Sequence, residues 1–222
     1  KAYRGQGQAS DLALHAAQLF YTAAPPLEPE RTARDFLEEH QTRAPMTQRG
    51  IPLGFPSLDD CIPGLSPGEV MVVAGQTSIG KSAFCLNLLY NWSALRHLRV
   101  ALFSTEMGGD TITDRLIALA GNLPLSAVRL KAYSDTQERQ STVAWGLLMQ
   151  TRYELVVSVG WTITQVMERC RLFKREGGLD LVILDYLQQF ISEKTKADHL
   201  TAETTRASRL SKILARELAV PV

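Results

Sequence analysis

The residues best suited to chemistry form one short loop, Gly75-Gln-Thr-Ser-Ile-Gly80-Lys81-Ser82. This loop matches the pattern G-x-x-x-x-G-K-[ST], with an apolar run, residues 71–74, before it and a helical pattern after it. Glycines permit backbone conformations in which successive N–H groups point at phosphate oxygens, and a helix N-terminus adds partial positive charge. The sequence therefore predicts a phosphate cradle formed by eight residues: Gly75, Gln76, Thr77, Ser78, Ile79, Gly80, Lys81 and Ser82.

Two residues of this loop and one distant acid predict a bound nucleoside triphosphate with its metal ion. Lys81 is expected to reach the β- and γ-phosphates, and the Ser82 hydroxyl is expected to ligate Mg²⁺. The apolar run that ends in Asp185 has the Walker B pattern, in which a carboxylate at the end of a strand positions Mg²⁺ directly or through water. We therefore predict ATP and Mg²⁺ as ligands, with Ser82 and Asp185 at the metal.

A further acid, Glu106, ends another apolar run, residues 100–105. In a parallel sheet the tip of this strand lies at the same edge as the phosphate loop, near the γ-phosphate. A carboxylate there can orient and activate an attacking water, which favours hydrolysis over phosphoryl transfer to another substrate. Glu106 and Lys81 are therefore the predicted catalytic residues. The alternative for Glu106 is a solvated acid at a strand end.

The sequence pattern predicts that alternating strands and helices position these residues. Four short apolar runs, residues 69–74, 99–104, 153–159 and 179–184, are separated by helical patterns that include residues 82–95 and 163–176. Near-continuous apolar strands that alternate with helices indicate a mainly parallel sheet covered on both faces. The predicted fold class is therefore α/β.

The first 49 residues are expected to form a helical arm outside the main domain, which spans residues 50–222. An amphipathic helix is predicted over residues 12–24 and a polar helix over residues 31–40, separated by the proline-rich stretch 24–30. Residues 44–50 have the composition of a linker. Such an arm packs either on its own subunit or on a partner.

Composition sets limits on location and partners. The chain has 222 residues, 45% of them hydrophobic, and a formal net charge of +1, so any basic surface for a nucleic acid must be local. No apolar run is long enough for a membrane span. The three cysteines lack metal-ligand spacing, which indicates free thiols in a reducing compartment and predicts a cytoplasmic location.

Several ordered motifs resemble those of the DnaB family of replicative DNA helicases. The segments 50–59 and 64–69 before the phosphate loop resemble the entry to that family's helicase domain, and Phe103-Ser-Thr-Glu-Met107 resembles its motif with the catalytic glutamate. Residues 162–178, followed by Leu184-Asp-Tyr-Leu-Gln188, resemble the approach to its Walker B strand. The resemblance covers residues 50–222 and implies a RecA-like P-loop NTPase fold.

The resemblance also implies a hexameric ring that hydrolyses ATP and threads single-stranded DNA through its centre, with primase or a helicase loader as partners. Residues 1–49 correspond to the family's linker region. Gln188 is expected to couple the nucleotide state to a DNA-facing loop, and Lys194, Lys196 and Arg206 are expected to contact DNA phosphates. The alternative for this polar loop is a solvated surface.

In the family, a γ-phosphate-sensing strand, a second DNA loop and an arginine finger lie beyond the position of Val222. The domain 50–222 is therefore expected to be incomplete at its C-terminal end, and the isolated chain is expected to bind nucleotide, hydrolyse it weakly and separate no strands. Two alternatives stay open: another RecA-fold DNA-dependent ATPase, or a truncated nucleotide-binding module that regulates a partner ring.

Overall fold

The computed structural model describes residues 32–42, 50–187 and 200–222. The chain divides into two compact units, residues 1–44 and 45–222. In the first unit, helix α2 (Ala33–Thr42) is the polar helix expected over residues 31–40, and the Thr32 N–H donates to Asp35 Oδ2 at its start (2.6 Å). The helix expected over residues 12–24 lies outside the described residues, as do residues 43–49.

The second unit is built on a parallel sheet with the strand order β2-β1-β3. Its strands are β1 (Val100–Ser104), β2 (Tyr153–Val157) and β3 (Leu181–Asp185). Ser104 lies opposite Val157 of β2 and opposite Asp185 of β3. The carboxyl ends of all three strands therefore lie at one edge of the sheet, as the sequence predicts for three of its four apolar runs.

The fourth run, residues 69–74, is not a regular strand, and this expectation was wrong. Its first part pairs with the end of the chain: Met71 N–H donates to Val222 O, and Val222 N–H donates to Glu69 O, both at 2.9 Å. Val182 of β3 in turn donates to Pro221 O at 3.1 Å. Residues 220–222 therefore lie between β3 and residues 69–71. Within the described residues this pairing stops at Met71, and Val72 is 69% exposed.

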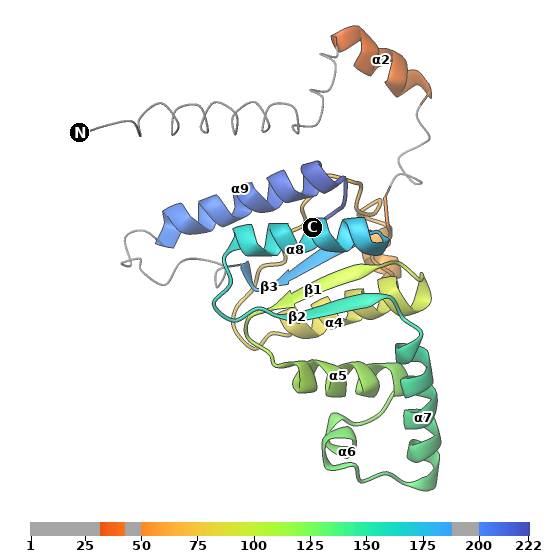
Figure 1. Cartoon of the computed structure of the whole chain (residues 1–222). Helices are drawn as coiled ribbons and strands as arrows, with labels where there is room; N and C mark the ends of the chain where they lie inside the picture. The colour runs from red at the N-terminus through yellow and green to blue at the C-terminus, as the bar shows by residue number, and fades with distance from the viewer. Residues whose placement is uncertain (1–31, 43–49, 188–199) are drawn as a thin grey trace, which may run out of the picture. The chain divides into compact units, whose positions relative to one another are not determined.

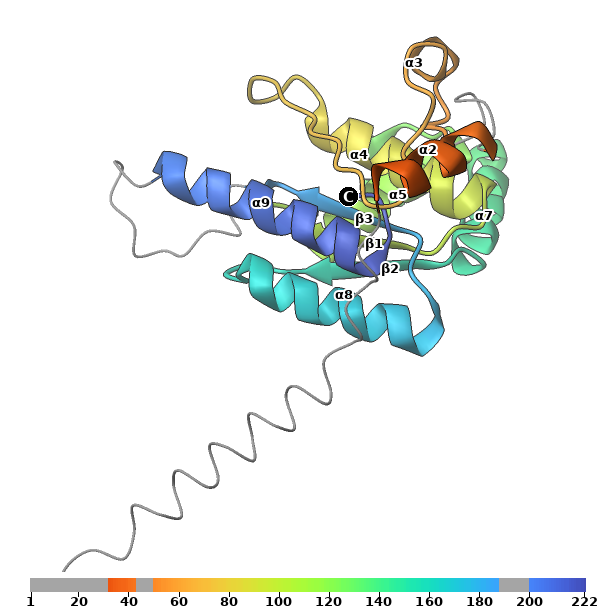
Figure 2. The same cartoon turned by 90° about the horizontal axis from the view of Figure 1, so that it is seen from above.

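Helices cover both faces of the sheet (Figure 1). One face carries α4 (Lys81–Tyr90), α5 (Gly109–Gly121), α6 (Leu125–Leu130) and α7 (Asp135–Met149). The other carries α8 (Ile163–Gly177) beside α9 (Leu200–Leu218), which Figure 2 shows from above. A short helix, α3 (Pro56–Asp59), precedes the phosphate loop.

Two hydrophobic clusters stabilise these layers, one on each side of the sheet. Val100 and Leu102 of β1 face the cluster formed with α4, α5, α6 and α7, whereas Ala101 and Phe103 face the cluster formed with α8 and α9. Successive side chains of a strand point to opposite faces, so an uninterrupted apolar strand serves both clusters. Phe103 packs against Trp161 at the start of α8, with ring centroids 6.3 Å apart.

The helix expected over residues 82–95 begins one residue earlier and changes character near its end. The π-helical turn η2 (Asn91–Leu95) follows α4. Leu88 and Trp92 are buried as the helical periodicity predicts, but Leu95 is 59% exposed. A π turn holds more residues than an α turn, so it rotates the last side chain away from the face that 3.6-residue spacing predicts. No described helix is long and apolar enough to cross a membrane.

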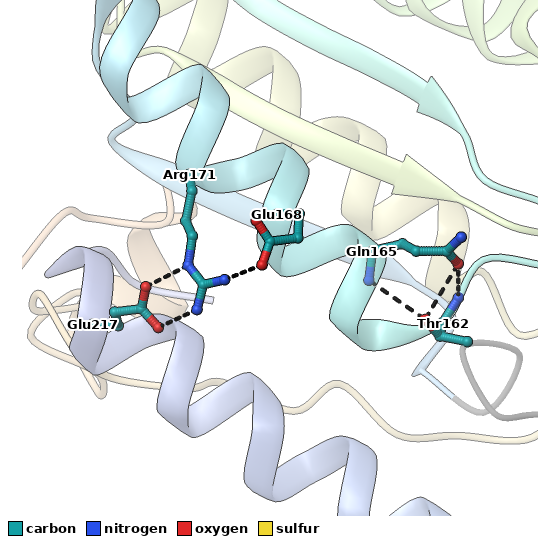
Figure 3. A network of polar contacts seen from close by, with 5 residues as sticks. All are labelled: Thr162, Gln165, Glu168, Arg171 and Glu217. Carbon is teal, nitrogen blue, oxygen red and sulfur yellow. Dashed lines mark hydrogen bonds and ion pairs between the residues drawn. The ribbon is translucent and has the colours of Figure 1, made fainter. Parts of the chain in front are cut away.

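Helix α8 has clear boundary signals at both ends. Thr162 and Gln165 form a capping box, in which each side chain accepts from the other residue's backbone N–H (Figure 3). At the other end Gly178 takes a φ of 91°, which a residue with a Cβ adopts only with strain. The predicted end of this helix at Gly177-Gly178 is therefore confirmed.

Candidate nucleotide site

The phosphate loop adopts backbone conformations that expose its N–H groups. Ser78 and Gly80 have positive φ values of 65° and 102°. A Cβ at Gly75 would lie 2.2 Å from Ile79 Cδ1, so only glycine fits there without displacing that side chain. Within the described residues, no backbone carbonyl accepts from the N–H groups of residues 76–80. These free donors fit the phosphates of a nucleotide, because such groups lower their free energy by binding anions.

Lys81 lies across the interior of this loop. Its Nζ donates to the carbonyl oxygens of Gly75 (2.9 Å) and Gln76 (2.7 Å). Lys81 is also the first residue of α4, so the positive end of the helix faces the same space. Both features place positive charge where the sequence predicts phosphate. An ammonium group held only by neutral carbonyls can exchange them for phosphate oxygens, which are stronger acceptors.

Asp185 gathers the predicted metal and catalytic residues around its carboxylate. Burial is the largest influence on its pKa, and raises it. A side-chain hydrogen bond from Ser82 lowers the pKa, the negative charge of Glu106 raises it, and the positive charges of Lys81 and Arg115 lower it. The pKa of Asp185 is raised in total, so its ionised form needs a cation nearby.

The donor set at this carboxylate suits magnesium. A hydroxyl and a carboxylate oxygen are hard ligands of the kind that Mg²⁺ prefers, alongside water and phosphate oxygens. The Ser82 side chain lies close enough to Asp185 to lower the pKa of that carboxyl, so the two residues are placed to share one ion. Ser82 follows Lys81 in the first turn of α4, which brings such an ion next to the phosphate loop.

Glu106 stands exposed at the same edge of the sheet, on a turn just beyond β1. The turn is closed by Ser104, whose Oγ donates to Met107 O (3.0 Å) and accepts from Met107 N–H (3.1 Å). Thr105 fixes the turn to β3, since its N–H donates to Asp185 O at 2.9 Å. The backbone of Glu106 is therefore held next to the predicted metal ligand Asp185, while its side chain remains exposed to solvent.

The predicted DNA and coupling residues fall mostly outside the described chain. Gln188, Lys194 and Lys196 belong to residues 188–199, which the structure does not describe. Arg206 lies on α9 and is exposed. Their roles therefore stay predictions.

One residue near the site is absent from the sequence-based prediction, namely Arg115 of α5. Its charge acts on Asp185, although Arg115 follows Glu106 by nine positions and belongs to none of the motifs. The available signal was an arginine between Ile112 and Leu116, both buried positions of an amphipathic helix. A long cation that flanks the apolar face of a helix ordinarily reaches solvent, so this signal is weak on its own.

This combination of a parallel sheet, a phosphate loop between sheet and helix, and two acids at neighbouring strand ends defines an ATPase domain of the RecA-like P-loop class. The family model described as "DnaB-like helicase C terminal domain" matches residues 50–222. The chain belongs to this family.

Relatives and solved structures agree with this assignment. The chain is 32% identical over 173 residues to the replicative DNA helicase DnaC of Bacillus subtilis, a match that covers 78% of this chain and 38% of the relative. It is 30% identical over 231 residues to the replicative DNA helicase DnaB of Leifsonia xyli, covering 99% and 50%. The chain thus spans half or less of the length of these relatives.

Two solved structures share the fold. One, described as an ATPase domain, superposes with a TM-score of 0.77 at 26% identity, over 87% of this chain and 70% of that one. A DnaB-like replicative helicase, studied for its interactions with primase, also gives a TM-score of 0.77 at 26% identity, over 95% and 51%. The predicted RecA-like α/β fold is therefore confirmed.

Proposed function

We propose that this chain is the ATPase motor of a replicative DNA helicase, which couples ATP hydrolysis to movement along single-stranded DNA and to duplex unwinding. The observation that carries the proposal is the hydrogen bond from Thr105 N–H to Asp185 O (2.9 Å), which holds Glu106 beside Asp185 at a site where Lys81 and Ser82 also act on the Asp185 carboxylate. Membership of the DnaB-like family supports the choice of DNA as the track.

In this proposal the residues of the site divide the work among binding, metal coordination and water activation. The loop from Gly75 to Ser82 binds the phosphates of ATP, and Lys81 neutralises charge on the β- and γ-phosphates. Ser82 and Asp185 hold Mg²⁺, which supplies charge neutralisation at the phosphates. Glu106 accepts a proton from the attacking water, and its exposure leaves room for that water.

The proposed DNA contacts are electrostatic. Lys194, Lys196 and Arg206 bind phosphates of the single strand, and Gln188 transmits the state of the nucleotide to that contact. The exposed guanidinium of Arg206 supports this role. A homohexameric ring is the assembly in which such contacts surround a single strand.

The proposed partners rest on the relatives, and the proposed location rests on the cysteines. Primase is a proposed partner, because a structurally similar DnaB-like helicase was solved for its interactions with primase. A helicase loader is a second proposed partner. The free thiols of Cys61, Cys85 and Cys170 support a reducing, cytoplasmic location.

The test is ATP hydrolysis by the chain with and without single-stranded DNA, alongside the variant Glu106→Gln. We expect stimulation by DNA and a loss of roughly 10²–10⁴-fold in kcat for Glu106→Gln, with nucleotide affinity retained. The matched control is Glu138→Gln, because Glu138 is an exposed acid of α7 on the same unit.

Each alternative predicts a different result. Turnover that responds to neither DNA nor Glu106→Gln would contradict the motor and favour a nucleotide-binding module. Turnover that depends on Glu106 but not on DNA would support the proposed ATPase activity and contradict the proposed movement along DNA.

A further inference from the structure

Arg115 carries a buried hydrogen-bond donor that nothing in the described chain satisfies. Its Nε is enclosed by protein and has no acceptor. Other arginines of this unit have carboxylate partners: Arg99 pairs with Glu154 at 2.9 Å, and Arg171 pairs with Glu217. A buried donor without a partner costs about 1–3 kcal/mol, and more when the group is charged, so such a donor calls for a ligand or a functional explanation.

The position of Arg115 on α5 directs its side chain toward the nucleotide site. Helix α5 begins three residues after Glu106, and side chains on an α-helix tilt toward its N-terminus. Arg115 also flanks Ile112 and Leu116, which face the cluster shared with α4. Helix α5 therefore packs against the helix that starts at Lys81, and the tilt of its side chains directs the head of Arg115 back toward the strand ends.

Electrostatics agrees with this direction. The positive charge of Arg115 stabilises the ionised form of the Asp185 carboxylate. Arg115 nevertheless forms no ion pair with Asp185 in the described chain, so its charge reaches the site while its hydrogen-bonding groups remain available. A guanidinium that lies near Asp185 without bonding to it is suited to bind an anion that enters between Arg115 and Asp185.

We propose that Arg115 is a phosphate-binding residue of the nucleotide site, whose guanidinium takes the terminal phosphate of a bound triphosphate. The inference rests on the proposed nucleotide site and deepens it. The terminal phosphate is the most negative part of the ligand and must approach Glu106 and Asp185, two carboxylates that repel it. Besides the proposed Mg²⁺, Lys81 supplies one positive side chain, and the planar fork of an arginine adds a second with matched geometry.

A terminal-phosphate contact has a signature that a structural role lacks, because ADP does not carry that group. We would measure dissociation constants for Mg·ADP and for Mg²⁺ with the β,γ-imido analogue of ATP, using the unmodified chain and Arg115→Met. The variant keeps a long apolar stem but removes the charge. Affinity for the triphosphate analogue is expected to fall roughly tenfold or more, which is the loss of one charge-assisted hydrogen bond, whereas affinity for ADP changes less than about twofold.

The matched control is Arg139→Met, which removes an exposed arginine of α7 from the same layer and should change neither affinity. Equal losses for both nucleotides in Arg115→Met, or no loss for either, would overturn the assignment of Arg115 alone. If the unmodified chain bound neither nucleotide, the proposed function would fall together with this inference.

A second measurement avoids the risk that Arg115→Met does not fold. Phenylglyoxal modifies accessible guanidinium groups, and its adducts on the unmodified chain can be mapped by mass spectrometry. The β,γ-imido analogue should slow modification of Arg115 severalfold, and ADP should slow it much less. The rate at which Arg139 is modified should be unchanged by either nucleotide. Equal protection of Arg115 by both nucleotides, or protection by neither, would contradict the proposal.

Discussion

The N–H and the hydroxyl of Thr105 both donate to one oxygen, the main-chain carbonyl of Asp185, at 2.9 and 3.2 Å. The N–H of Tyr186 donates back to the Thr105 hydroxyl at 3.3 Å. Because Thr105 directly precedes Glu106, these bonds fix the backbone of the proposed water-activating acid against that of the proposed metal ligand. The spacing between the two acids is thus set by the main chain, one residue beyond the pairing of Ser104 with Asp185.

Replacement of Thr105 by valine tests this link. Valine has nearly the same shape but no hydroxyl, so two hydrogen bonds of a buried group are lost while the backbone bond remains. We expect the free energy of unfolding to fall by about 1–3 kcal/mol, measured by urea denaturation. Thr105→Ser keeps the hydroxyl and should lose less. A Thr105→Val variant as stable as the unmodified chain would show that the hydroxyl does not hold the two strand ends together.

Asp185→Asn should stabilise the nucleotide-free chain and abolish its response to the metal. Burial raises the pKa of Asp185 above its ordinary value, so the folded protein binds this proton more tightly than the unfolded chain does. Stability is therefore lost as pH rises through the raised pKa, and asparagine avoids that loss. We expect a higher Tm for Asp185→Asn at neutral pH and a smaller difference in acid, below the ordinary pKa of aspartate. The variant should gain little Tm from Mg·ADP.

The exposed Asp60 provides the control for this experiment, since Asp60→Asn should alter neither the pH dependence nor the gain from Mg·ADP. A lower Tm for Asp185→Asn at neutral pH would show that hydrogen bonding by the carboxylate outweighs its desolvation.

The pair Arg171–Glu217 fastens α8 to α9, and its effect on stability should depend on pH. Two bonds join the side chains, Nε to Oε1 at 2.5 Å and Nη2 to Oε2 at 2.8 Å, and Glu168 contacts the same guanidinium (Figure 3). The hydrogen bond from Arg171 lowers the pKa of Glu217. A depressed carboxyl pKa contributes stability above the pKa of the unfolded chain, and this contribution disappears as pH falls through the folded value.

Glu217→Gln should therefore cost stability at neutral pH and little in acid. Both side chains are more than one third exposed, so solvent screening limits the expected cost to about 1 kcal/mol or less. Urea denaturation at neutral pH and at about pH 3 would measure it, with Glu168→Gln as the control that keeps the bidentate pair. A cost for Glu217→Gln that is equal at both pH values would indicate lost packing instead of a lost ion pair.

The parts of the site that are predictable from sequence are those that the geometry of a parallel sheet determines. Asp185 and Glu106 end apolar strands, and the carboxyl ends of parallel strands meet at one edge, so their proximity follows once the strands are recognised. Ser82 joins them because a helix that follows a phosphate loop begins at that same edge. Their roles in catalysis and metal binding remain predictions.

Other features depend on contacts that no local pattern encodes. The run 69–74 has strand composition, but whether it forms a regular strand depends on its partner, here residues 220–222 at the opposite end of the sequence. The exposure of Leu95 depends on a π turn, which shifts the helical period by less than one residue. Arg115 is polar at a position flanking a helix core, and only the tertiary structure shows that its Nε is enclosed.

Thiol reactivity should distinguish the three cysteines by their burial. Burial raises the pKa of Cys85 to about 11, with a smaller contribution from the charge of Asp185, and raises that of Cys170 to about 12. Cys61 is exposed. Only the thiolate reacts with iodoacetamide, and a pKa two units higher lowers the thiolate fraction about a hundredfold near pH 8. We expect Cys61 to be alkylated first, and Cys85 and Cys170 only through transient opening of the fold.

Peptide mass mapping over time would measure the three rates, and denaturation in urea should make them similar. If Cys85 were alkylated in the folded chain as fast as Cys61, α4 would have to open readily behind the phosphate loop, and burial would not protect its thiol in the nucleotide-free protein.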